Sequence, residues 1–235
     1  MVDLTSEMAQ LWTSLGPWVP GRARVIQFVG AVAGEGSSTI AREFARLAVQ
    51  RSRRAVWLVD LDLANATQHA AILADAKRFG GLGPETTASP DGSTFFTVQP
   101  PTRGPDGRPW PDARYIAARQ IGGRQFWVTR FRREMLRGAQ QPHMVPSDAY
   151  WTALRQHADV IVLDTPSADR STAALAVAPF ADTTVIVVAA DQGDVRRTAA
   201  LRDGIIGAGG RCAGIVFNRA QVETPNFIKA ILPGA

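Results

Sequence analysis

The stretch "QFVGAVAGEGSSTIAREFA", residues 27–45, decides the fold. An apolar run leads into a glycine-rich turn, and two serines and a helical pattern follow it. This order predicts a phosphate-binding loop, because backbone N–H groups at a helix N-terminus converge on an anion. Gly34 and Gly36 provide the turn, but Ser37 stands where such loops carry a lysine. The stretch therefore predicts the backbone of a nucleotide site without its usual cation.

Short apolar runs alternate with helical patterns along most of the chain. Runs that are apolar on both faces predict strands of a parallel sheet covered by helices. The predicted strands are 24–30, 55–60, 159–164, 183–190 and 211–217, and the helical patterns are 37–53, 168–181 and 193–209. This repetition predicts a doubly wound α/β fold with a mostly parallel sheet, whose ligands bind at the carboxyl ends of the strands.

The segment from about 80 to 146 interrupts this rhythm between the second and third core strands. Its first half is too rich in Gly and Pro for helices. In "RYIAARQIGGRQFWVTRF" (114–131), Gly122 and Gly123 supply the positive φ of a two-residue hairpin turn. We expect an inserted β-hairpin, with "STFFTVQ" (93–99) as its third strand. We expect residues 1–235 to form a single domain that carries this insertion.

The composition is that of a globular protein. The chain has 235 residues, of which 46% are hydrophobic and 20% charged, with a net charge of +5. Only Lys77 and Lys229 among the basic residues are lysines, and we attribute the arginine bias to genome composition rather than to polyanion binding. The single Cys212 excludes an intrachain disulfide. No stretch approaches the ~20 apolar residues of a membrane helix, and the N-terminus lacks signal-peptide features, so we expect a cytoplasmic protein.

Carboxylates follow two of the predicted strands. Asp60 and Asp62 lie in "VWLVDLDLANA", and Asp164 ends the run in "ADVIVLDTPSA". Carboxylates at strand ends beside a phosphate loop hold magnesium or its waters, or orient a nucleophile. Ser38 occupies the hydroxyl position that ligates the metal in such loops. The sequence therefore predicts Ser38, Asp60, Asp62 and Asp164 as magnesium ligands.

A simpler interpretation of "GEGSST" (34–39) remains open at this stage. Turns of glycine and serine commonly begin helices, and the hydroxyl of Ser37 or Ser38 could serve only to cap one. Three acids at matching strand ends favour the nucleotide interpretation.

These motifs resemble the bacterial tyrosine kinases of polysaccharide synthesis and export, within the deviant-Walker class of P-loop proteins. The resemblance spans nearly all of the chain except the insertion and is carried by "AVAGEGSST" (31–39), "VWLVDLDLAN" (56–65), "DVIVLDTPS" (159–167) and "GGRCAGIVFNRA" (209–220).

The resemblance implies a P-loop NTPase-like fold that binds ATP or ADP with Mg²⁺. It implies nucleotide contacts from the loop and, near the adenine, from Asn218, for which a strand-terminating turn residue is the simpler alternative. In an active member, Asp60 would take part in catalysis. The implied nucleotide-binding residues are Gly34, Glu35, Gly36, Ser37, Ser38, Thr39 and Asn218.

The chain also departs from this family. Ser37 replaces the loop lysine, and Val32 stands where partition-type relatives have a second lysine. Loss of a phosphate-bound cation typically costs ~10²-fold or more in rate. Arg170 and Arg42 are the candidates for a substitute cation, although arginine would need its own geometry.

The family's phosphorylated tyrosines and the arginines of its ring-forming helix are missing as well. The family's C-terminal tyrosine cluster is absent, and we interpret Tyr115 and Tyr150 as a hairpin residue and an aromatic at a helix start. In "EMAQLWT" (7–13), Glu7 of the family's ring-forming helix remains, while Gln10 and Thr13 replace its arginines. Self-association is therefore left open.

Three functions follow. The first is a pseudoenzyme, similar to holdfast polysaccharide accessory proteins, that a membrane-embedded chain-length or export protein recruits to the inner membrane. The second is an active ATPase or tyrosine autokinase with a substitute cation. The third is a positioning-type relative that binds DNA through "RQFWVTRFRREMLRG" (124–138) or membrane through "NFIKAIL" (226–232). Packing explains both stretches more simply, and we expect no nucleic-acid partner.

Overall fold

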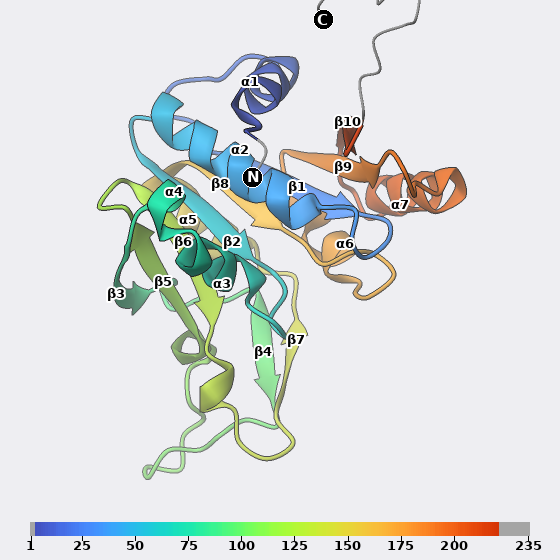
Figure 1. Ribbon diagram of the computed structural model, residues 1–235. Coiled ribbons are helices and arrows are strands. Elements are labelled where there is room, and N and C mark those ends of the chain that lie inside the picture. The colour runs from blue at the N-terminus through green and yellow to red at the C-terminus, as the bar shows by residue number, and fades with distance from the viewer. Residues whose placement is uncertain (1–2, 221–235) are drawn as a thin grey trace, which may run out of the picture.

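The computed structural model describes residues 3–220, and its centre is an eight-stranded sheet (Figure 1). The strand order is β10-β9-β1-β8-β2-β6-β5-β3, and a separate ribbon pairs β4 with β7. The strands are β1 Arg24–Gly30, β2 Ala55–Asp60, β3 Leu82–Thr87, β4 Phe96–Gln99, β5 Ile116–Ile121, β6 Phe126–Phe131, β7 Gln141–Met144, β8 Ala158–Asp164, β9 Thr183–Ala189 and β10 Cys212–Asn218. The predicted α/β fold with a mostly parallel sheet is confirmed, because β10, β9, β1, β8, β2 and β6 all run parallel.

Helices cover both faces of this sheet. They are α1 Thr5–Ser14, α2 Ser37–Arg51, α3 Thr67–Ala74, α4 Ala76–Phe79, α5 Asp148–His157, α6 Ala173–Val177 and α7 Val195–Gly207, with 3-10 turns at Asp112–Tyr115, Arg133–Met135 and Ala178–Phe180. The helical pattern predicted at 168–181 is thus a short helix that continues as a 3-10 turn at Pro179, since proline cannot donate to an α-helical bond.

The sequence of β1 explains why the sheet is buried on both sides. Phe28 points to the face of α1 and α2 and packs on Phe44 with 5.3 Å between ring centroids. Val25 and Val29 point to the opposite face, which α5, α6 and α7 cover. Gln27 is also buried, but its side chain bonds the Ala174 carbonyl at 2.9 Å and the Thr184 hydroxyl at 2.8 Å, so no polar atom is stranded.

The inserted segment extends the central sheet. Strand β6 pairs in parallel with β2, and β5 returns antiparallel to β6, which confirms the predicted hairpin. Its connection is longer than the two residues expected: Gly122 and Gly123 have φ of 60° and 63°, and four residues separate the two strands.

The predicted third strand of the hairpin is wrong. Strand β3, not the 93–99 segment, pairs with β5, whereas β4 pairs with β7. The apolar residues Phe95 and Phe96 pack instead against Tyr150, Trp151 and Phe131, with ring centroids 5.0–5.3 Å apart. The expectation of a single domain stays a prediction.

Two further expectations concern membranes and the chain end. Among the described residues, no helix combines the length and apolar character needed to cross a bilayer. The "NFIKAIL" segment and Lys229 lie outside the described residues.

Gly122 provides a test of the hairpin geometry. A Cβ at Gly122 would lie 2.8 Å from the Phe79 carbonyl oxygen, whereas a Cβ at Gly123 would meet nothing within 4 Å. Both residues have positive φ, so alanine at either costs roughly 1–2 kcal/mol. We expect Gly122→Ala to lower the free energy of unfolding in urea further than the matched control Gly123→Ala. Equal losses would show that the close approach to Phe79 relaxes freely.

Candidate functional site

The phosphate loop, residues 31–36, joins the end of β1 to the start of α2. Gly36 is the N-cap of α2, with φ 90°, and no side chain caps the helix. The hydroxyls of Ser37 and Ser38 therefore do not cap α2, and the simpler capping interpretation of this stretch is wrong. The helix N-terminus keeps its partial positive charge for an anion.

Side chains on both sides hold the loop in place. The Glu35 carboxylate accepts the Val32 N–H at 2.9 Å. From the end of β10, the Asn218 amide donates to the Glu35 carbonyl at 2.9 Å, and Arg219 donates to the Gly34 carbonyl at 2.8 Å. The Asn218 side-chain oxygen accepts the Arg219 N–H, so both ends of this amide are used within the fold. Asn218 thus clamps the loop, and the adenine contact that the resemblance implied stays a prediction.

A pocket of about 230 Å³ lies between this loop and the carboxyl ends of β2 and β8. This is the edge of the sheet where a doubly wound fold binds its ligands. The predicted residues that line it are Gly34, Gly36, Ser37, Ser38, Asp62 and Asp164; Glu35, Thr39, Asp60 and Asn218 are not part of its wall.

Asp60 supports the site from behind. Asp60 and Asp164 are register partners at the ends of β2 and β8. The Asp60 carboxylate accepts the backbone N–H groups of Asp62 and Gln68, each at 2.9 Å, and only 2% of the residue is exposed. Burial, followed by the nearby Asp164 charge, raises the pKa of Asp60 well above its ordinary value. The position of Asp60 fits a structural anchor, and its expected role as a metal ligand or catalytic group stays a prediction.

Asp164 is buried but belongs to the pocket wall. One carboxylate oxygen accepts from the Gln68 side chain at 2.6 Å, while the other has no partner among the described residues. Burial raises the pKa of Asp164 to about 6, and hydrogen bonding from Gln68 opposes this shift. The Thr165 hydroxyl beside it is likewise buried and unpaired among those residues. Buried polar atoms without partners on one wall fit a pocket that takes a polar ligand or a cation.

Gln68 is the residue that sequence reasoning missed. Its side chain also donates to the Ser38 carbonyl at 2.8 Å and accepts from Arg42 at 3.0 Å. Arg42 is therefore directed into the protein rather than into the pocket. No local pattern marks Gln68, because its partners come from three other segments.

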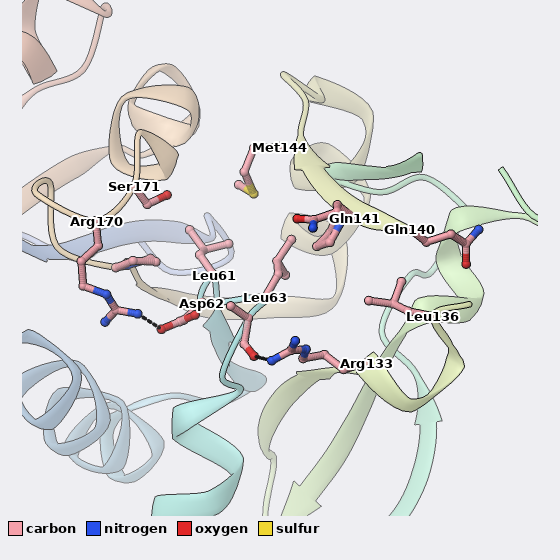
Figure 2. Close-up of a pocket in the computed structure, with 13 residues that line it drawn as sticks. Leu61, Asp62, Leu63, Arg133, Leu136, Gln140, Gln141, Met144, Arg170 and Ser171 are labelled. Carbon is pink, nitrogen blue, oxygen red and sulfur yellow. Dashed lines mark hydrogen bonds and ion pairs between the residues drawn. The ribbon is translucent and has the colours of Figure 1, made fainter. Parts of the chain in front are cut away.

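Arg170 does line the pocket. Its guanidinium lies 3.1 Å from the Asp62 carboxylate (Figure 2). Asn65 donates to both Asp62 oxygens at 3.0 Å. Of the cationic side chains in residues 3–220, Arg170 alone contributes to this wall; Lys77 lies on α4 away from it. The cation of the site is thus already paired with an acid.

The wall is chemically suited to magnesium in part. Ser38, Asp62 and Asp164 offer the oxygen ligands that Mg²⁺ prefers. Across residues 3–220, however, no three acidic, histidine or cysteine side chains gather as metal ligands. A cation held by one or two carboxylates, the Ser38 hydroxyl and water fits these residues better than the predicted set with Asp60.

A second hollow of about 300 Å³ adjoins the first and shares Asp62, Pro166 and Arg170 with it. Figure 2 shows Leu61 and Leu63 facing Leu136 and Met144 of the insertion across this space. Arg133, also from the insertion, reaches the Ala64 carbonyl. The insertion therefore builds the wall beside the phosphate pocket.

Solved structures share this fold. The chimerical protein CapA2B2 aligns with a TM-score of 0.60 and 17% identity over 93% of this chain and 86% of its own. The kinase domain of the Escherichia coli tyrosine kinase ETK aligns at 0.55 and 14% over 94% and 78%, and the BceF tyrosine kinase domain at 0.54 and 18% over 92% and 74%. Comparison with protein-family models and with curated proteins gives no match. At these identities, the likeness establishes that the chain folds as bacterial tyrosine kinase domains do.

The buried Asp164 predicts a pH-dependent stability. Its folded pKa is raised to about 6 from 3.8, so its contribution is fully favourable below pH 3.8 and is lost as the pH rises through 6. At pH 7.5 and without metal, the Asp164→Asn variant should unfold at a higher urea concentration than the wild type. Its free energy of unfolding should exceed that of the wild type by up to about 3 kcal/mol. The advantage should vanish near pH 4. An advantage independent of pH would contradict the raised pKa.

The loop clamp predicts a second effect. A Cβ at Gly36 would collide with the Asn218 amide, whereas one at Gly34, at nearly the same φ, would meet nothing within 4 Å. Gly36→Ala should therefore lower the melting temperature further than Gly34→Ala. Adding Asn218→Ala should remove most of the difference, and its persistence would place the cost elsewhere.

Proposed function

We propose that this chain is a degenerate member of the bacterial tyrosine kinase family that binds nucleotide and hydrolyses it poorly or not at all. Its role is that of a cytoplasmic accessory or regulatory protein in the synthesis or export of an exopolysaccharide, of which a holdfast-type polysaccharide is one example. A membrane-embedded chain-length or export protein would be its partner and would recruit it to the inner membrane.

One observation carries this proposal: the phosphate pocket has Ser37 in the lysine position, and its nearby guanidinium, Arg170, is paired with Asp62. Preformed amides at a helix N-terminus can still hold phosphates. Hydrolysis needs more, because charge develops on the terminal phosphate in the transition state. A cation neutralised by a neighbouring carboxylate stabilises that charge less than a free lysine would.

The environments of the two tyrosines also argue against autokinase activity. Tyr150 is fully buried, and its hydroxyl donates to the Ala88 carbonyl at 3.2 Å. Tyr115 is 1% exposed and donates to the Thr102 hydroxyl at 3.2 Å. Neither hydroxyl is free to accept a phosphoryl group, and the sequence holds no other tyrosine. The link to polysaccharide rests on the sequence motifs together with the shared fold.

Arg170 favours a second candidate function, an active ATPase. Its side chain is 47% exposed and lies on the wall of the pocket, so exchange of its Asp62 contact for a phosphate contact requires only a rotamer change. In that case Arg170 would replace the lysine.

The positioning-type alternative loses its best sequence support. Arg130 and Arg132 of the 124–138 stretch contact Glu85 at 2.8 Å and 3.2 Å, and Arg130 also pairs with Glu134. These guanidinium groups are neutralised within the fold, which favours packing over DNA binding for this stretch.

Calorimetry and turnover with magnesium and ATP or ADP test the proposal. We expect measurable binding of both nucleotides and little hydrolysis by the wild type. Ser37→Lys should raise turnover by about 10²-fold, because it restores a cation at the developing charge. The matched uncharged control, Ser37→Gln, should leave it unchanged.

Two results would contradict this view. Wild-type turnover that Arg170→Gln lowers at least tenfold would establish the active alternative instead. Absence of binding by either nucleotide would remove the nucleotide from the proposed role and leave an accessory protein without a ligand.

A further inference from the structure

Arginines gather at the end of the sheet opposite the phosphate pocket, where the core strands begin. Two hollows of about 390 Å³ each lie there, on either side of the segment 18–22. We name this surface the basic end face; the charged residues that line it are Arg22, Arg24, Arg51, Arg53, Arg54 and Arg211 with Asp159 and Asp182.

The two acids of this face are already neutralised. Asp159 pairs with Arg54 at 2.7 Å, and Asp182 pairs with Arg155 at 2.7 Å. In contrast, the guanidinium groups of Arg22, Arg53 and Arg211 are exposed and have no hydrogen-bond or carboxylate partner within residues 3–220. Uncompensated positive charge is therefore concentrated on this face.

An apolar tip projects between the hollows. Val19 is 59% exposed there. Behind it, Trp18 stacks on Trp12 with 3.6 Å between ring centroids, and Arg24 and Arg51 lie over these rings at 4.8 Å and 5.6 Å. The tip is thus held on a rigid aromatic base.

We propose that the basic end face binds the anionic headgroups of a lipid bilayer directly. Free arginines would meet headgroup phosphates in the two hollows, while Val19 enters the interface and the tryptophans lie at headgroup level. An acidic peptide is the other chemistry that such charge fits. A bilayer fits better, because the charges come from several separate segments at the starts of β10, β9, β1, β8 and β2, and because an exposed apolar side chain stands among them.

This contact would orient the protein. The phosphate pocket lies at the carboxyl ends of the strands, so it would face away from the bilayer and stay open to nucleotide. The inference is independent of the proposed function, since it requires neither nucleotide nor a protein partner.

Co-sedimentation of the full chain with vesicles tests the proposal, with no nucleotide present. We expect binding to vesicles of phosphatidylglycerol mixed with phosphatidylcholine, weaker binding at high salt, and little binding to phosphatidylcholine alone. Each arginine near an anionic surface contributes about 5-fold, so the triple variant R22Q/R53Q/R211Q should lose on the order of 100-fold in affinity. Val19→Asp should also weaken binding.

The matched control is R103Q/R108Q/R196Q, which removes the same charge from exposed arginines in the 100–110 loop and at the start of α7. It should bind nearly as the wild type does, and unchanged melting temperatures would show that all variants fold. Equal losses in the two triple variants, or equal binding to neutral vesicles, would overturn the proposal. Binding to polyglutamate or to duplex DNA through the same three arginines, without binding to anionic vesicles, would assign this face to a different partner and overturn it as well.

Discussion

Two carboxylates buried side by side at the ends of β2 and β8 impose the constraint on which the site depends. Asp60 and Asp164 would repel each other if both were charged and alone. Gln68 resolves much of this conflict, since its backbone donates to Asp60 and its side chain to Asp164. The same side chain holds the Ser38 carbonyl, so the starts of α2 and α3 are tied to the ends of two strands. A buried polar network of this kind fixes one arrangement of the backbone, because any slip would leave a charge unpaired.

That network divides the acids by role. Asp60 is satisfied by two backbone amides and faces inward, whereas Asp62, two residues further on, emerges into the pocket and meets Arg170. Asp164 lies between these extremes, buried yet with one oxygen unpaired among the described residues. A cation bound on this wall would relieve the unpaired oxygen and compete with Arg170 for Asp62. The electrostatics of the site therefore depend on whether Asp62 pairs with Arg170 or with a bound cation.

The sequence predicted the framework more fully than the site. Strands 24–30 and 55–60 match the structure residue for residue, because runs that are apolar on both faces have one stable use, inside a covered sheet. The prediction for the 93–99 run was wrong because β4 pairs with β7, while Phe95 packs on α5 and Phe96 only contacts the hairpin through Phe131. The stretch "LGPETT" carries too little alternation to be recognised as β3. The roles of Asp60 and Asp62 could not be separated, since both follow the same strand. The role of Gln68 could not be predicted from the sequence, because its contact with Asp164 spans 96 residues.

The insertion links these observations to the rest of the molecule. It adds β6 to the parallel sheet, and it also supplies Arg133, Leu136 and Met144 to the hollow beside the phosphate pocket. Asp62 and Arg170 belong to both walls, so a ligand in either hollow acts on the same ion pair. A ligand that draws Arg170 away in one space leaves Asp62 uncompensated in the other, and favours a cation there. The two spaces are therefore coupled through one guanidinium. The strength of that coupling depends on how far water screens the attraction between Arg170 and Asp62, since the Arg170 side chain is half-exposed.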